Sequence, residues 1–334
     1  MSVNIRNISL EWRFEINQRL LFYSSYTLLP FGIILNKILI FFHLRKNYIN
    51  SNIRCFYIFI SLNSIFALTI TLVRFIGQIE IYTFEENTEI GCKLVQFFTR
   101  IAYSASSWLN FLLTIDRLVF IIFQNKYKIL SGKYFVLKLI VCLYLLLSVV
   151  NIPNLLYTSL TRVKNDTGQL EFINVCVGSI ELNVVRELMS QIIGLYVPFF
   201  MMIATNFYLI HKVLQSKKKF KNTKETNFAF SLIISNIIFL ISLVPFSIYL
   251  FLRLASIMDI DWNKRFVSYE GFMALYETCA RIIFCYNLSI GLLVQIFLNR
   301  VLRKEFLIMI SQLFNLFGVK LKFKTSIESS SSKN

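Results

Sequence analysis

The stretch CKLVQFFTRIAYSASSWLNFLLTIDRL, Cys92–Leu118, contains the two features that decide the fold. It is apolar and long enough to cross a bilayer, which takes about 20 mostly apolar residues. It also ends on an adjacent ionisable pair, Asp116 and Arg117. An ionisable side chain near the centre of a membrane costs at least ~2.5 kcal/mol on insertion scales, so the pair needs a reason. Either it is an interfacial salt bridge that anchors the helix, or it has a role in function.

The composition predicts that this stretch belongs to an all-α membrane protein. Hydrophobic residues make up 56% of the 334 residues and charged residues 16%, whereas soluble domains carry about 25% charged residues. Ten Gly and four Pro exclude disordered, collagen-like and turn-rich all-β chains. Residues 1–19 precede a predicted seven-transmembrane helix bundle at 20–298. Its spans are Leu20–His43, Cys55–Gly77, Cys92–Phe123, Tyr134–Tyr157, Leu188–Val213, Phe228–Leu252 and Gly271–Leu298.

The charges of the connecting segments predict the orientation of the chain. The loops after spans 1, 3 and 5 and the C-terminal tail carry 18 basic and three acidic residues, against nine basic and 13 acidic residues in the other connections. Basic segments stay in the cytoplasm, so we expect a multi-pass plasma-membrane protein with an extracellular N-terminus and a cytoplasmic C-terminus. The cluster Lys217–Lys221 beside a span favours anionic membrane lipids over nucleic acid as a partner. Two glycosylation sequons, at Asn7 and Asn165, fall on the extracellular side.

Two of the six cysteines lie outside the predicted spans or at their outer end. Cys92 stands at the outer start of span 3, and Cys176 lies in the loop between spans 4 and 5. The other four are within spans, where a cysteine behaves as a small apolar residue. Since the extracellular side is oxidising, we expect a disulfide that ties this loop over the mouth of the bundle, the alternative being two unrelated thiols.

The joint spacing of several motifs resembles the rhodopsin-like (class A) G-protein-coupled receptors over nearly the whole chain. Cys92 lies 25 residues before Arg117, which is the family interval between the outer cysteine of helix 3 and the arginine of the Asp-Arg-Tyr motif. Phe239 lies six residues before Pro245, as the family's helix 6 phenylalanine does. Further matches are the helix 1 asparagine Asn36, the helix 3 aromatic Trp108, the bend prolines Pro153 and Pro198, and Asn287-Leu288-Ser289 near the end of helix 7.

The resemblance also implies an eighth helix. Residues 299–317 follow span 7, and Leu302, Phe306, Met309 and Leu313 fall at helical spacing on one face, which suits a helix lying on the inner leaflet. We expect residues 318–334 to form a disordered cytoplasmic tail.

What the resemblance implies is a receptor and not an enzyme. Ligand binding outside would separate the inner ends of helices 5 and 6. Arg117, held at rest by Asp116, would then turn toward a heterotrimeric G protein, and Phe239, Pro245, Asn36 and Asn287 would belong to the activation machinery. No cofactor is expected. The sequence shows no clustered nucleophile, acid pair or metal set, and its two histidines, His43 and His211, form no ligand constellation.

Several residues that are typical of the family's motifs are replaced in this sequence. Leu118 stands for the tyrosine of Asp-Arg-Tyr, Leu243 for the helix 6 tryptophan, and Ser64 for the helix 2 aspartate that belongs to a sodium site. The Asn-Pro-x-x-Tyr motif of helix 7 appears as Gly291–Gln295, GLLVQ. These departures imply either that the receptor switches through another packing or that it signals poorly.

The resemblance narrows the ligand by exclusion. Amine receptors carry a helix 3 aspartate where this chain has Thr99, and opsins carry a helix 7 lysine where it has Cys285. Arg100, Glu277 and Arg281 remain as candidate ligand-binding charges near the outer halves of spans. They either satisfy one another or meet a carboxylate or cationic group of the ligand. The first outer loop holds four acids and no base, which favours a basic or amidated neuropeptide; they are Glu80, Glu85, Glu86 and Glu89.

Other functions stay open. A chemosensory or odorant-type receptor would share the fold. A seven-span ligand-gated channel would place its N-terminus inside, against the charge distribution, and a transporter would show repeated halves and broken helices.

Overall fold

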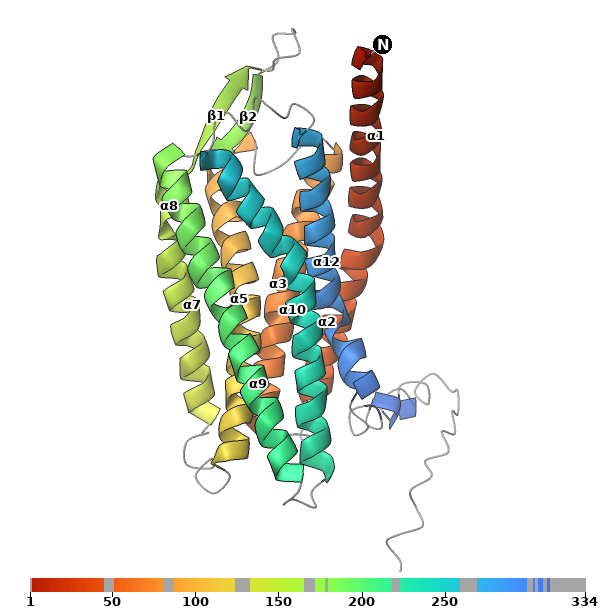
Figure 1. The fold of residues 1–334 in the computed structure, drawn as a ribbon, viewed down its shortest axis with the longest axis vertical. Coiled ribbons are helices and arrows are strands. Elements are labelled where there is room, and N and C mark those ends of the chain that lie inside the picture. The colour runs from red at the N-terminus through yellow and green to blue at the C-terminus, as the bar shows by residue number, and fades with distance from the viewer. Residues whose placement is uncertain are drawn as a thin grey trace, which may run out of the picture.

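The computed structural model describes residues 2–44, 51–80, 87–123, 133–164, 172–177, 180–217, 223–258 and 269–298, together with 303, 306–308 and 311–312. Long helices run side by side along the longest axis of the molecule (Figure 1). The helical elements are α1 (Ser2–Tyr23), η1 (Ser24–Leu28), α2 (Leu29–Leu44), α3 (Ser51–Glu80), α5 (Glu89–Ile122), α7 (Lys133–Leu156), α8 (Ile180–Gln191), η2 (Ile192–Tyr196), α9 (Val197–Lys217), α10 (Thr223–Met258) and α12 (Tyr269–Leu298).

Six stretches of the described residues are helical, long and apolar enough to cross a membrane. They correspond to the first six predicted spans, and they are Trp12–Leu44, Ile53–Ile79, Glu89–Ile122, Tyr134–Leu156, Glu187–Gln215 and Phe230–Ala255. The predicted seventh span, Gly271–Leu298, lies in α12, which is not among these six. α12 has 30 residues and packs against both α10 and α2, so it completes the bundle between its last and first spans.

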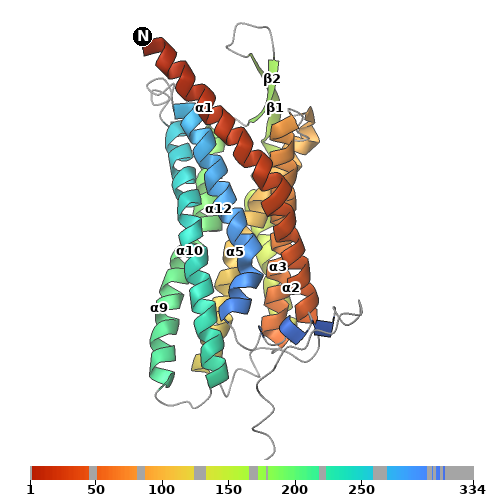
Figure 2. The ribbon, with the colours of Figure 1, turned by 90° about the vertical axis from the view of Figure 1, so that its right-hand side faces the viewer.

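The first helix begins at Ser2, well before the predicted start at Leu20. α1 contains neither Gly nor Pro, so nothing in its sequence ends the helix before η1 and α2. α1 leans across α12 in Figure 2, and the two helices are in contact. Asn7 lies within α1. The N-terminal segment is therefore a helical extension of the first span.

Two π-helical turns, η1 and η2, each end two residues before a proline, Pro30 and Pro198. A proline has no N–H to donate, and its ring clashes with the carbonyl four residues earlier, which lies inside the π-helical turn. The wider turn accommodates that clash without ending the helix. Pro153 and Pro245 lie inside α7 and α10.

A small antiparallel hairpin stands at one end of the bundle, an element that the helical patterns did not predict. β1 (Ser159–Lys164) pairs with β2 (Phe172–Val177), with Cys176 opposite Leu160. β1 also contacts α5. We call the end of the bundle that carries β1 and β2 the hairpin end. α1 projects at the same end (Figure 1).

Several predicted features lie outside the described residues. The sequon Asn165 and the loop glutamates Glu85 and Glu86 are among them, and so is the tail at 318–334. Of the predicted eighth helix at 299–317, Leu302, Met309 and Leu313 also lie outside. The described residues of that segment, Phe306 included, are helical.

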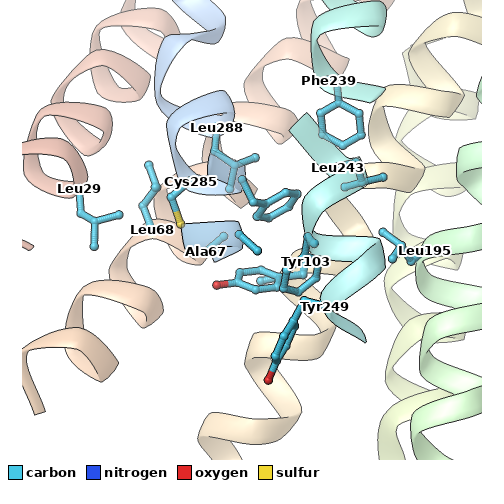
Figure 3. Close-up of a cluster of buried hydrophobic side chains, with 14 of the residues drawn as sticks. Leu29, Ala67, Leu68, Tyr103, Leu195, Phe239, Leu243, Tyr249, Cys285 and Leu288 are labelled. Carbon is cyan, nitrogen blue, oxygen red and sulfur yellow. The ribbon is translucent and has the colours of Figure 1, made fainter. Parts of the chain in front are cut away.

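Clusters of buried apolar side chains fill the bundle. Five of the core side chains are at most 1% exposed. They are Leu29, Ala67 and Leu68 of the first two spans, Leu243 of α10 and Phe284 of α12. They belong to one cluster with Tyr103 of α5 and Leu195 of η2, and Figure 3 shows part of this cluster, with Ala67 near Tyr103. Burial of this apolar surface among the helices fixes the position of the polar groups described below.

Glycines allow the helices to approach closely at two points. A Cβ added to Gly32 of α2 would lie 2.0 Å from Ser289 Oγ of α12, and one added to Gly194 of η2 would lie 2.2 Å from Ser104 Oγ of α5. Both distances are far below van der Waals contact, so a side chain at either crossing requires the facing serine to move.

We expect the Gly32→Ala variant to be less stable than the parent by about 1–3 kcal/mol, the usual cost of overpacking a core. Its methyl group would push α12 away through Ser289. Thermal unfolding of the detergent-purified protein measures the loss. Adding Ser289→Gly should restore most of it, and an equally unstable double variant would contradict the assigned contact.

Candidate functional site

A cavity opens among the helices toward the hairpin end of the bundle. Its empty volume, including solvent at the mouth, is about 640 Å³. Six elements contribute to it, and its lining consists of Arg74, Gln96, Thr99, Arg100, Tyr103, Ser104, Glu187, Ser190, Gln191, Gly194, Leu195, Phe246, Leu250, Arg253, Arg281 and Phe284. Apolar walls with a few converging polar groups are typical of ligand sites.

Arg100 and Glu187 form a buried ion pair on one side of the cavity. Arg100 Nη1 donates to Glu187 Oε2 at 3.1 Å, and Nη2 donates to Oε1. The Glu187 side chain is 3% exposed. Arg253 Nη2 lies 4.0 Å from the same Oε1, so this carboxylate sits between two guanidinium groups. The pair fastens α8 to α5 across the cavity.

Glu277 and Arg281 pair along α12. Arg281 Nε donates to Glu277 Oε1 at 2.8 Å, and Nη2 donates to the same oxygen. Arg281 lines the main cavity, and together with Arg74 and Glu277 it also lines a neighbouring cavity of about 380 Å³. Asn17 of α1 contributes to this second cavity.

Of the three charges predicted at the site, Glu277 and Arg281 pair with each other, and Arg100 does not join that pair. Arg100 pairs with Glu187 and not with the α12 charges. Sequence reasoning missed Glu187, Arg74 and Arg253. Arg74 lies inside the predicted second span, and Glu187 and Arg253 each adjoin the end of a predicted span. A charged residue within or beside an apolar span is the signal that could have identified all three.

Aromatic rings form the inner end of the cavity. The Phe246 and Phe284 rings stack with centroids 5.6 Å apart, and Tyr103 lies 5.0 Å from Phe284. Phe239 follows deeper in the bundle, 6.4 Å from Phe284. Leu243, which occupies the position of the family tryptophan, is completely buried beside them. A chain of rings therefore connects the cavity to the middle of α10.

The carbonyl of Pro245 in α10 and that of Ile193 in the π-helical turn η2 each accept a hydrogen bond from a neighbouring helix. The Tyr276 hydroxyl of α12 donates to the Pro245 carbonyl at 3.2 Å. Trp108 Nε1 of α5 donates to the Ile193 carbonyl in η2 at 2.9 Å. Side chains thereby link α12 to α10 at Pro245 and α5 to the π-helical turn η2.

Hydrogen bonds from polar side chains also link other pairs of helices. Asn36 Nδ2 donates to the carbonyls of Gly32 and Leu288, at 2.8 and 2.9 Å, joining α2 to α12. Asn63 Nδ2 donates to Ser106 Oγ at 2.8 Å, joining α3 to α5. Asn287 Nδ2 is buried and has no acceptor among the described residues.

A second polar cluster joins three helices toward the end opposite the hairpin. Asn236 Nδ2 of α10 donates to Thr114 Oγ1 of α5 at 2.7 Å and to Asn206 Oδ1 of α9 at 3.0 Å. The Thr114, Asn206 and Asn236 residues are all buried. We call them the three-helix clasp. Sequence reasoning did not identify it, since single Asn and Thr residues in apolar spans carry no spacing signal.

Asp116 and Arg117 lie one turn beyond the clasp. Arg117 Nε donates to Asp116 Oδ2 at 3.1 Å, and Nη2 donates to the same oxygen. The guanidinium carbon also lies 5.2 Å from the centroid of the Phe120 ring. The Arg117 side chain is 5% exposed. This local pairing is the one that the sequence predicted.

Cys92 lies at the start of α5, is completely buried and is engaged in a disulfide. Thr88 caps the same helix end, where its hydroxyl accepts from Gly91 N at 2.9 Å. Cys55, Cys142, Cys279 and Cys285 are not in disulfides. Among the described side chains no group of His, Cys, Asp and Glu is arranged to hold a metal ion.

Comparison with known proteins identifies the family of this bundle. The model of the 7 transmembrane receptor (rhodopsin family) matches residues 35–295. No curated protein matches the chain in a sequence comparison. The matched region runs from within α2 to within α12, so it contains the cavity, the three-helix clasp and Arg117. The chain is a member of the rhodopsin family of seven-transmembrane receptors, which are signalling receptors of the plasma membrane and not enzymes.

Proposed function

We propose that this receptor converts binding of an extracellular neuropeptide into activation of a heterotrimeric G protein. The observation that carries the proposal is the placement of two sites at opposite ends of the same helices. α5 and α10 line the cavity at the hairpin end, and their other halves carry Arg117 and Asn236. A ligand that changes the packing of these two helices in the cavity would change their packing at Arg117.

The proposal includes the membrane arrangement. α12 is the seventh span, the hairpin end is extracellular, and the segment after α12 forms an eighth helix on the inner leaflet. Cys176 is the proposed disulfide partner of Cys92, because β1, which pairs with the strand that carries Cys176, contacts α5. An amine or retinal ligand does not fit, since the matching positions are Thr99 and Cys285. Anionic membrane lipids contact the basic inner loop.

The test of the proposal is G-protein activation in cells that display the N-terminally tagged receptor. Surface labelling of the tag in intact cells verifies the orientation, and a broad neuropeptide library supplies the ligands. A peptide response that requires the receptor supports the proposal. Silence toward every peptide, with the tag accessible at the surface, contradicts the neuropeptide assignment and favours a chemosensory ligand.

We expect Asn236→Leu to raise basal G-protein activation. The substitution removes two buried hydrogen bonds that hold α10 to α5 and α9. A net loss of about 1 kcal/mol per bond shifts the balance toward the open state by roughly fivefold or more. Nucleotide exchange without ligand measures the effect.

Thr205→Val is the matched control, because its hydroxyl bonds within α9 to the Met201 carbonyl and joins no second helix. Its basal activity should equal that of the parent. Unchanged basal activity in Asn236→Leu, at equal surface display, would exclude the three-helix clasp as a restraint.

A further inference from the structure

A buried histidine lies at the end of the bundle opposite the hairpin. His43 is in the last turn of α2 and is 1% exposed. Its ring stacks on the Tyr57 ring of α3, with centroids 4.9 Å apart and an interplanar angle of 4°. The neighbouring Phe42 ring meets it edge-on at 5.4 Å. The imidazole therefore lies against two aromatic rings.

Neither ring nitrogen of His43 has a hydrogen-bond partner among the described residues. A neutral imidazole carries one donor and one acceptor, and a protonated imidazole carries two donors. A buried polar group without a partner costs free energy, and a buried charge without a partner costs far more. The polarity of His43 thus works against the packing that buries it, and a proton on the ring would work against that packing more strongly.

The charged side chains near His43 are cations. Arg54 of α3 lies close enough for its charge to act on the imidazole. α12 also packs against α2, and its last turns, Gly291–Leu298, contain no ionisable residue. On α2 itself Lys37 is the one other basic residue, and the basic residues 45–46, which follow the helix, lie outside the described part of the chain. Neither α2 nor this stretch of α12 supplies a carboxylate to offset a proton on the ring.

Tyr57 connects His43 to Arg117. It is 4% exposed and shares an apolar cluster with Leu113 of α5, one turn before Arg117. The charge of Arg117 acts on the Tyr57 hydroxyl, and Arg117 also pairs with Asp116. A change in the packing of His43 on Tyr57 would therefore change the surroundings of Arg117.

We propose that His43 is a proton-sensitive element that loosens the contact between α2 and α3 beside Arg117 as the pH falls, and thereby raises basal signalling. The link to signalling rests on the proposed function, whereas the effect on stability does not. In the proposed orientation of the receptor, the proton comes from the cytosol.

The direction of the effect follows from proton binding. When the contact opens, water reaches the ring, and a hydrated imidazole has the ordinary histidine pKa of about 6.5. The open form then binds more protons than the closed form, so a fall in pH favours the open form. The gain is nearly absent at about pH 7.5 and reaches roughly fourfold at about pH 6.

The first experiment measures stability without signalling, by thermal unfolding of the full-length receptor in detergent at these two pH values. His43→Phe keeps an aromatic ring on Tyr57 and removes both nitrogens. It should unfold at a higher temperature than the parent at the higher pH, and its midpoint should fall less on acidification. His43→Leu, which cannot titrate either, should show the same reduced acid shift even if the larger phenylalanine ring disturbs the packing.

His211→Gln is the matched control. His211 is the one other histidine in the chain; it is exposed and bonds Gln215 at 2.8 Å. The control should keep the full acid shift of the parent. An acid shift as large in His43→Phe and His43→Leu as in the parent would overturn the inference, and so would an acid shift that disappears in His211→Gln.

The second experiment measures basal nucleotide exchange at the two pH values, with the same G protein for every variant so that its own pH dependence cancels. The ratio of parent to His43→Phe should be roughly fourfold higher at the lower pH. An equal ratio at both pH values overturns the link between His43 and signalling. Exchange that is absent from every variant, while the acid shift in stability is present, supports the proton-sensitive contact and contradicts the proposed function.

Discussion

Arg117→Ala should abolish G-protein activation and leave the amount of receptor at the cell surface unchanged. The side chain lies at the end of α5 opposite the cavity, where it contacts the neighbouring Asp116 and the Phe120 ring. Truncating it removes the charge proposed to meet the G protein. Ligand-stimulated nucleotide exchange should fall to the level of cells without receptor.

Two variants make the result specific. Asp116→Asn weakens the ion pair that restrains Arg117, so its basal activity should rise. Lys138→Ala removes an exposed cation from α7 and should signal as the parent does. Signalling retained by Arg117→Ala at normal surface display would refute the central role of this residue.

Glu187→Leu should destabilise the receptor more than Gly32→Ala does. The carboxylate is nearly fully buried and bridges α8 to α5 through Arg100. Removing one partner of a buried ion pair costs about 3–5 kcal/mol, chiefly because the other charge remains in an apolar setting. The midpoint of thermal unfolding should fall, and surface display should fall with it.

The cost should come from the remaining charge and not from the lost volume. The Arg100→Leu/Glu187→Leu double variant removes both charges and should therefore recover most of the stability. Glu187→Gln, which keeps the shape of the side chain, should lie between the parent and Glu187→Leu. A double variant as unstable as Glu187→Leu would contradict the assignment of Arg100 as the principal partner.

Local features of this receptor were predictable from sequence, and contacts between distant segments were not. Glu277 and Arg281 are four residues apart, so helical geometry brings them together. Asp116 and Arg117 are adjacent in the sequence, so they are close in any fold. Arg100 and Glu187 are 87 residues apart, and their pairing depends on how α8 docks against α5. The three-helix clasp likewise requires the relative positions of α5, α9 and α10.

The segment Gly291–Gln295, which replaces the Asn-Pro-x-x-Tyr motif of helix 7, lies within α12. α12 runs through Gly291 to Leu298 without a proline, and no heavy atom of the described residues lies within 4 Å of a Cβ added at Gly291. The sequence left two interpretations of the lost Asn-Pro-x-x-Tyr motif. Either the receptor switches through another packing of its helices, or it signals poorly. The rings of Phe239, Phe246 and Phe284 provide a route from the cavity into α10 that does not use that motif, so we favour a different switch.

The most direct test of this signalling mechanism needs no identified ligand. Basal nucleotide exchange is measured on membranes supplied with a representative of each G-protein class, for the parent, for Asn236→Leu and for Asn236→Leu combined with Arg117→Ala. We predict that Asn236→Leu raises exchange on at least one class and that the added Arg117→Ala returns it to background at equal surface display. Exchange that stays elevated in the double variant would contradict the claim that this receptor signals by releasing α10 and exposing Arg117.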